Sequence, residues 1–111
     1  FPTINLEIDP NQALPADGVY ATRTHIDGKT YQSITNIGKN PTFGENKRTI
    51  ETYIIAFEGD LYGHKGKIDF IERLRDEKRF ENIADLKRQI TEDVARGQAI
   101  LDSNNEGETL R

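Results

Sequence analysis

The chain has 111 residues, a net charge of −4 and no cysteine, and 31% of its residues are charged. This length suits one domain with a single core, and the lack of cysteine excludes disulfides and thiolate metal sites. The acidic balance gives no overall basic field for nucleic acid, and no apolar run is long enough to cross a membrane. We therefore expect a cytoplasmic domain that binds neither nucleic acid nor membranes.

The beginning of the chain indicates a piece of a longer protein. There is no methionine, so Phe1 is not a translation start, and we expect a segment before it. Residues 1–8 end in an alternating Leu-Glu-Ile pattern that is typical of a short strand. Residues 9–17 hold two prolines and two aspartates, which predicts a loop.

A β-hairpin is predicted next. Residues 18–26 and 29–37 are rich in threonine, tyrosine and isoleucine, and Asp27-Gly28 separates them as a two-residue turn. The polar segment 38–48 follows, and loops of that length in a compact domain are often functional.

Glu51 lies in the strand predicted over residues 48–58. Alternate residues of a strand share a face, so Glu51 points the same way as Tyr53 and Ile55. A carboxylate at the end of an apolar row loses some hydration, which favours uptake of a proton and makes Glu51 a candidate general base. The alternative is a solvated strand glutamate that pairs with a nearby lysine or arginine.

Thr3 and Asn5 form a second candidate pair, because they share a face if residues 1–8 are extended. A hydroxyl and an amide carbonyl are hard oxygen ligands of the kind that suits Mg²⁺. The alternative is an ordinary polar face on an edge strand.

The second half of the chain predicts one more strand and then a helix. Residues 67–73 read as the strand, and residues 74–80 are highly charged. Helical spacing begins after Asn82, which is suited to cap the helix with support from Asp85, and the apolar residues of its stripe are Leu86, Ile90, Val94 and Leu101. Residues 102–111 read as a polar, frayed tail. Strands followed by one helix favour a small antiparallel β barrel closed by a terminal helix.

Six segments in this order resemble the riboflavin kinase domain, most closely the carboxyl-terminal half of the bifunctional bacterial riboflavin kinase/FAD synthetase. They cover nearly the whole chain, and they are FPTIN at 1–5, GVYAT at 18–22, TNIGKNPTF at 35–43, IETYIIAFEGDLYG at 50–63, LRDEKRF at 74–80 and QITEDVARGQAIL at 89–101. The resemblance implies a six-stranded antiparallel Greek-key barrel with a carboxyl-terminal helix over residues 1–101. It also implies a first strand and a flap upstream of Phe1, and an amino-terminal adenylyltransferase domain in the full-length protein.

The reaction that the resemblance implies is transfer of the γ-phosphoryl group of ATP to the ribityl 5′-hydroxyl of riboflavin, which gives FMN and ADP. Glu51 matches the catalytic glutamate of that family. FPTIN matches its Pro-Thr-Ala-Asn motif, with Ile4 in place of alanine. The remaining implied roles are Mg²⁺ and ATP binding by Thr3 and Asn5, nucleotide binding by Asp60 and Tyr62, and flavin binding by Arg75, Glu77 and Phe80.

Two other functions stay open from the sequence. A non-catalytic regulatory barrel would bind flavin without forming an ATP-dependent product. A β-barrel interaction module would bind neither flavin nor magnesium-ATP.

Overall fold

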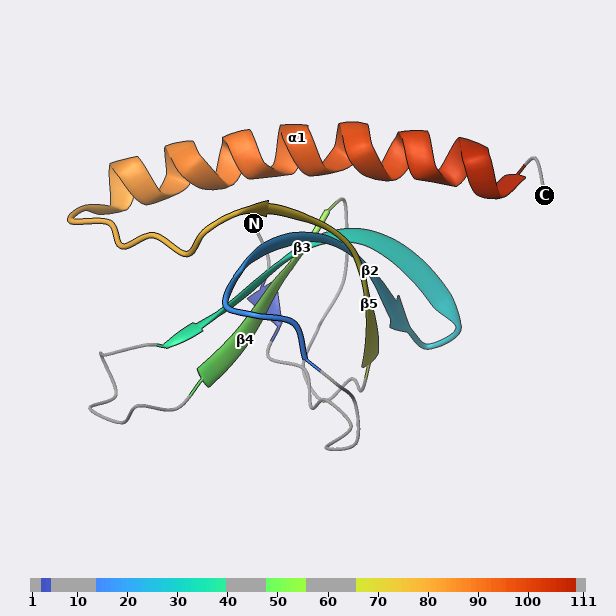
Figure 1. Cartoon of the computed structure of the whole chain (residues 1–111), viewed down its shortest axis with the longest axis horizontal. Helices are drawn as coiled ribbons and strands as arrows, with labels where there is room; N and C mark the ends of the chain where they lie inside the picture. Colours follow the sequence, from blue (N-terminus) through green and yellow to red (C-terminus); the bar gives the residue numbers. More distant parts are fainter. Residues whose placement is uncertain (1–2, 5–13, 40–47, 56–65, 110–111) are drawn as a thin grey trace.

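The structure is a computed structural model that describes residues 3–4, 14–39, 48–55 and 66–109. A curved sheet lies beneath one long helix (Figure 1). The elements are β1 Thr3–Ile4, β2 Gly18–Ile26, β3 Lys29–Lys39, β4 Arg48–Ile54, β5 Gly66–Arg75 and α1 Ile83–Thr109.

The strands form one sheet in the order β1-β4-β3-β2-β5, and every neighbouring pair is antiparallel. The predicted class, a mostly-β antiparallel fold with a carboxyl-terminal helix, is confirmed. Five strands are present among the described residues. The sixth strand and the closed barrel stay predictions.

The predicted hairpin between β2 and β3 is confirmed. Ile26 and Lys29 are paired across the turn, and the two turn residues, Asp27 and Gly28, have φ angles of 51° and 77°. Positive φ at both central positions is the requirement of the type I′ turn, whose twist matches the twist of the strands on either side.

The inner face of the sheet, which points away from α1, carries an apolar cluster and a set of buried hydroxyls. The cluster consists of Ile26, Ile54 and Ile68, with Tyr31, Ile50 and Phe70 packed against them. The hydroxyls belong to Thr22, Thr24, Ser33, Thr35 and Thr52, and each of these residues is 0% exposed. They bond to one another across the strands, for example Thr35 Oγ1 to Thr52 Oγ1 at 3.0 Å. The interior is therefore held by hydrogen bonds as well as by apolar contact.

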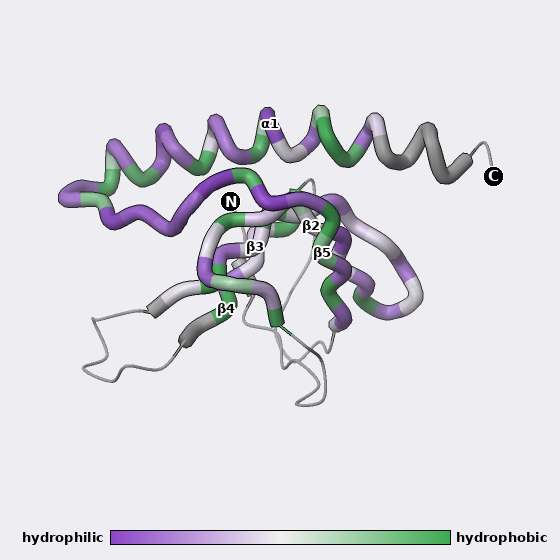
Figure 2. The backbone as a smooth tube through the Cα atoms, in the orientation of Figure 1, coloured by the Kyte–Doolittle hydropathy of each residue, from purple (hydrophilic) through white to green (hydrophobic). Residues whose placement is uncertain are grey.

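The opposite surface, the helix face, packs against α1. Its cluster contains Val19, Ala21, Ile34, Leu74 and Leu101, with Tyr53, Ile55, Ile71, Val94 and Ile100 around them. At Gly97 the helix comes so close to the sheet that a Cβ would collide with Ile34 Cδ1. Figure 2 shows hydrophobic residues alternating with hydrophilic ones along α1, as expected for a helix with one buried stripe.

Both ends of α1 can be compared with the sequence. The predicted cap is confirmed, because the Asp85 amide donates to Asn82 Oδ1 at 2.9 Å. The expected tail at 102–111 is instead helical as far as Thr109. The apolar stripe ends at Leu101, but a formed helix propagates one hydrogen bond per residue without needing an apolar face, and residues 102–109 contain no proline.

Polar contacts fix α1 onto the strands. Arg96 Nη1 donates to the Leu74 carbonyl oxygen at 2.8 Å, and Gln32 Nε2 donates to Asp102 Oδ1 at 2.6 Å. Within the described ranges, α1 lacks the run of apolar residues that a membrane-crossing helix requires.

Candidate functional site

Four paired residues run across the sheet and define the candidate site. Glu51 of β4 pairs with Asn36 of β3, Asn36 pairs with Val19 of β2, and Val19 pairs with Arg75 of β5. Directly paired residues point to the same face, and Val19 belongs to the cluster beneath α1. This cross-strand row therefore lies on the helix face, with a carboxylate and a guanidinium at its two ends. Three strand spacings separate the ends, or about 14 Å.

Tyr53 lies two residues after Glu51 on the same face, as the sequence predicted. Its pKa is raised above 10.0, first by burial, then by the charge of Glu51 and then by the charge of Asp93, while Arg75 lowers it. The phenol therefore keeps its proton at neutral pH and can act as a hydrogen-bond donor. The charges of Glu51, Asp93 and Arg75 all act on this phenol, so the three residues lie within electrostatic reach of Tyr53.

Arg75 is bound by an aspartate of the helix. Arg75 Nε donates to Asp93 Oδ1 at 2.9 Å and Arg75 Nη2 donates to Asp93 Oδ2 at 2.7 Å. Gln89 Nε2 also donates to Asp93 Oδ1, at 3.1 Å. Asp93 is only 4% exposed. Two parallel N–H···O bonds fix both the position and the plane of a guanidinium, so α1 determines where Arg75 is presented.

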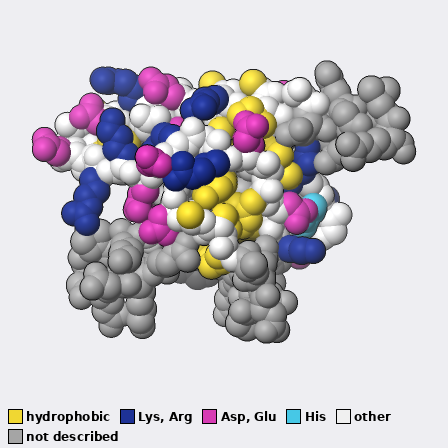
Figure 3. Space-filling view, in the orientation of Figure 1, with side chains coloured by type: hydrophobic (Ala, Val, Ile, Leu, Met, Phe, Trp, Pro, Cys, Tyr) yellow, Lys and Arg dark blue, Asp and Glu magenta, His cyan; other side chains and the backbone are white. Residues whose placement is uncertain are grey.

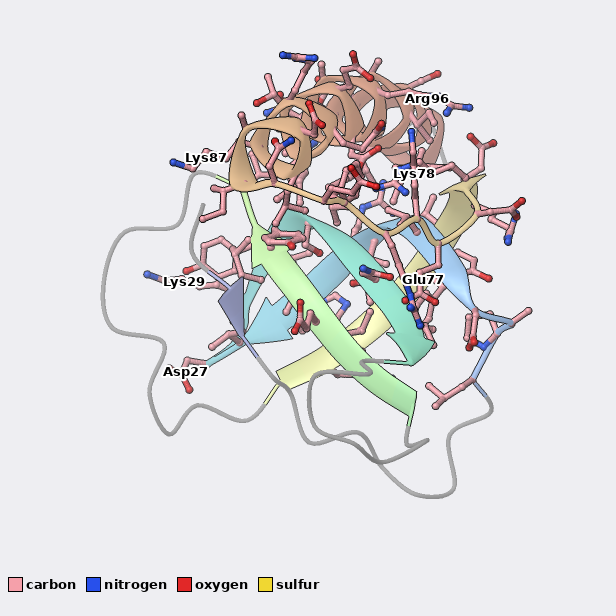
Figure 4. The ribbon with its side chains drawn as sticks, turned by 90° about the vertical axis from the view of Figure 1, so that its left-hand side faces the viewer. Asp27, Lys29, Glu77, Lys78, Lys87 and Arg96 are labelled. Atoms are coloured by element: carbon pink, nitrogen blue, oxygen red, sulfur yellow. The ribbon has the colours of Figure 1, made fainter. Side chains whose placement is uncertain are left out.

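Asn36 has a side-chain oxygen that is buried and has no hydrogen-bond partner among the described residues. Gly38, two residues along β3, is on the same face. The carboxylate of Glu77 fills the space in front of Gly38 that a side chain would take. Figure 4 shows Glu77 and Lys78 on the connection between β5 and α1, beside the sheet. Oxygen acceptors thus gather at the Glu51 end of the cross-strand row.

The three predicted flavin-binding residues lie at or just after the end of β5. Arg75 is the last residue of that strand, and Glu77 and Phe80 lie on the connection that leads to α1. Phe80 is half-buried, and Lys78 Nζ lies 5.7 Å from the centre of its ring. Figure 3 shows hydrophobic side chains gathered where the helix meets the sheet, with basic and acidic groups around them.

The predicted metal and nucleotide residues are only partly described. In β1, Thr3 pairs with Tyr53, which places its backbone beside the strand that carries Glu51. Asn5, Asp60 and Tyr62 lie outside the described residues. Among residues 3–4, 14–39, 48–55 and 66–109, no three His, Cys, Asp or Glu side chains come together to hold a metal. The hydroxyl of Thr3 and the amide oxygen of Asn5 are oxygen ligands of the hard kind that Mg²⁺ prefers.

Sequence reasoning missed two residues of the site. Asp93 gave a signal, because it is an acidic residue three positions after Ile90, within the apolar stripe of the helix. Asn36 gave no such signal. The sequence of a strand rich in threonine does not reveal that this asparagine is buried or that it pairs with Glu51.

The chain is similar to known proteins over most of its length. The model of the Flavokinase family, described as riboflavin kinase, matches residues 1–101. The bifunctional riboflavin kinase/FMN adenylyltransferase of Bacillus subtilis is 35% identical over 96 residues, which is 84% of this chain and 30% of that protein. The protein of the same name from Pseudomonas fluorescens is 36% identical over 100 residues, or 89% of this chain and 32% of that protein.

A solved structure shows the same arrangement of elements. A crystal structure described as a macrolide-efflux protein from Streptococcus pneumoniae matches with a TM-score of 0.78 at 31% identity, over 87% of this chain and 32% of that chain. The present chain therefore spans about a third of the length of the proteins that it matches.

Proposed function

The chain belongs to the riboflavin kinase family, and from that premise we propose that it transfers the γ-phosphoryl group of ATP to the ribityl 5′-hydroxyl of riboflavin. The products are FMN and ADP. The observation that carries the proposal is the cross-strand row, which has Glu51 at one end and Arg75 at the other beneath α1.

Glu51 is the proposed general base. It accepts the proton of the 5′-hydroxyl as the oxygen attacks the γ-phosphorus, and the bond from that phosphorus to the bridging oxygen of ADP breaks. Positioned acid–base groups contribute about 10² to 10⁴ in rate. The nearby Tyr53 phenol, which stays protonated, offers a hydrogen bond that holds the carboxylate or the substrate in place.

Arg75, Glu77 and Phe80 are proposed to bind the flavin. Arg75 is held by Asp93, so it arrives in a fixed orientation, and a preorganised donor loses less entropy when a ligand binds. The half-buried ring of Phe80, on the connection between β5 and α1, offers an aromatic surface. Phosphoryl transfer depends mainly on such alignment of the reactants.

Thr3 and Asn5 are proposed to bind Mg²⁺ and the ATP phosphates, and Asp60 and Tyr62 to bind elsewhere on the nucleotide. The support is the pairing of Thr3 with Tyr53, which brings the motif beside the Glu51 strand. Bound Mg²⁺ would neutralise charge on the phosphates, which also accounts for ATP binding by an acidic chain.

The whole protein is proposed to be larger and bifunctional. Its amino-terminal part would be an adenylyltransferase domain that converts FMN to FAD, as in the names of the relatives above, and its location would be the cytoplasm.

The test is incubation of the protein with riboflavin and magnesium-ATP, followed by separation of the flavins. FMN that appears only with ATP supports the proposal. Flavin fluorescence quenching without FMN would instead identify a regulatory flavin-binding barrel. Neither quenching nor magnesium-ATP binding would identify an interaction module.

A further inference from the structure

We propose that Asn36 is a positioning residue that recognises the ribityl chain of the substrate. Its side-chain oxygen would accept a hydrogen bond from a ribityl hydroxyl. The inference rests on the proposed function and adds to it a residue that determines specificity for a polyol tail.

The first observation is an unsatisfied acceptor. Asn36 Oδ1 is buried and has no hydrogen-bond partner among the described residues. Leaving a buried acceptor unpaired costs about 1–3 kcal/mol, and most buried polar atoms are paired. An exception of this kind at a candidate site indicates an atom whose partner arrives with the ligand.

The second observation is the position of that acceptor. Asn36 pairs with Glu51 across β3 and β4, and the side chains of such a pair are about 5 Å apart at their Cβ atoms. Two hydroxyls of one flexible polyol can reach both groups. One hydroxyl would donate to Asn36 Oδ1 while the terminal hydroxyl is held against the Glu51 carboxylate.

The chemistry of the neighbours points to the same class of ligand. Glu51 and Glu77 are acceptors when ionised, and Glu77 lies against Gly38, two residues from Asn36. This group of acceptors favours a ligand that is rich in O–H donors. A ribityl chain has several such donors, whereas the fused flavin ring has mainly acceptors and apolar edges. We therefore assign this end of the cross-strand row to the polyol and the Arg75 end to the ring.

The segment that carries Glu77 is suited to adjust to a ligand. The connection 76–82 carries Glu77, and its residues 76–79 are exposed and outside regular secondary structure. Segments of this kind move at low free-energy cost, so the Glu77 carboxylate can shift to accept a hydrogen bond from the ligand without disturbing the sheet.

The experiment compares riboflavin with lumiflavin, which has the same ring system and a methyl group in place of the ribityl chain. Affinities for Asn36→Leu and the unchanged protein are measured by quenching of flavin fluorescence. Leucine has a similar size and no polar atom, so riboflavin should bind about tenfold more weakly, the loss expected for one hydrogen bond. Lumiflavin affinity should stay the same.

The matched control is Gln32→Leu, which also replaces an amide on the helix face of β3 but at its far end, where the amide bonds to Asp102. It should leave both affinities unchanged. If Asn36→Leu does not fold, as judged by its thermal transition, Asn36→Ala takes its place with the same expectation.

Two outcomes would overturn the assignment of Asn36: unchanged riboflavin affinity, or equal losses for riboflavin and lumiflavin. Absence of FMN formation by the unchanged protein is a different result, which would overturn the proposed reaction itself. The two failures are therefore distinguishable.

Discussion

Asp93 of α1 binds the Arg75 guanidinium through two hydrogen bonds of 2.9 and 2.7 Å, and so ties the helix to the last strand at the candidate site. The side chains are 5% and 20% exposed. The pair is therefore largely removed from water, where the loss of one partner leaves the other charge uncompensated.

Asp93→Asn should lower the free energy of unfolding by about 3 kcal/mol, because Arg75 would stay largely buried without its counter-charge. Chemical denaturation measures the change. Adding Arg75→Met to that variant should restore part of the loss. Glu92→Gln, at the exposed neighbouring position, serves as the control and should change stability little. A loss no larger in Asp93→Asn than in Glu92→Gln would contradict this account of the pair.

Glu51→Gln should reduce FMN formation by about 10² to 10⁴, the range for removal of a general base. Riboflavin affinity should change only a few-fold, since glutamine keeps the size and one acceptor oxygen. Turnover and fluorescence quenching separate the two effects. Glu72→Gln, at an exposed position of β5, is the control and should keep normal activity. Near-normal turnover by Glu51→Gln would remove this residue from the chemistry.

The raised pKa of Tyr53 predicts that the folded protein becomes less stable at alkaline pH. Its pKa in the folded chain lies above the ordinary 10.0, so the folded state holds the proton more tightly than the unfolded state does. The resulting stabilisation is present below pH 10.0 and is lost as pH rises through the folded pKa. Tyr53→Phe has no such proton, so the stability of the unchanged protein should fall relative to this variant above pH 10.0. Urea denaturation at pH 8 and at higher pH tests this, and a constant difference would contradict it.

Gly97→Ala should destabilise the protein although alanine favours helices by about 1 kcal/mol. The added methyl group collides with Ile34 Cδ1, and overpacking typically costs about 1–3 kcal/mol. Ile34→Val removes the colliding atom, so the double variant should be more stable than the sum of the single effects predicts. Strict additivity in denaturation measurements would show that the helix does not approach the sheet this closely.

Sequence patterns within short segments were sufficient to predict much of the fold. The bounds predicted for the first hairpin strand agree with β2, Gly18–Ile26, because strand composition and the Asp-Gly turn act over a few residues. The start of α1 was predicted for the same reason, since a cap is a contact across three residues. The helical stretch beyond Leu101 was missed because no apolar pattern marks it.

Part of the geometry of the candidate site was predictable, but the contacts that connect its residues were not. Glu51 and its shared face with Tyr53 follow from strand alternation. The contact of Arg75 with Asp93 joins residues 18 positions apart, and the pairing of Asn36 with Glu51 depends on strand register. Packing of the whole domain determines both, and no short segment contains that information.

The hydrogen bond between Thr35 and Thr52 on the inner face has a consequence for evolution. If β4 slid by one position along β3, every side chain of β4 would exchange faces, and Glu51 would be turned into the interior. The buried threonines oppose that slippage without contacting any substrate. Substitution of one of these buried threonines should therefore abolish turnover in some related proteins, although every residue that contacts the substrate is unchanged.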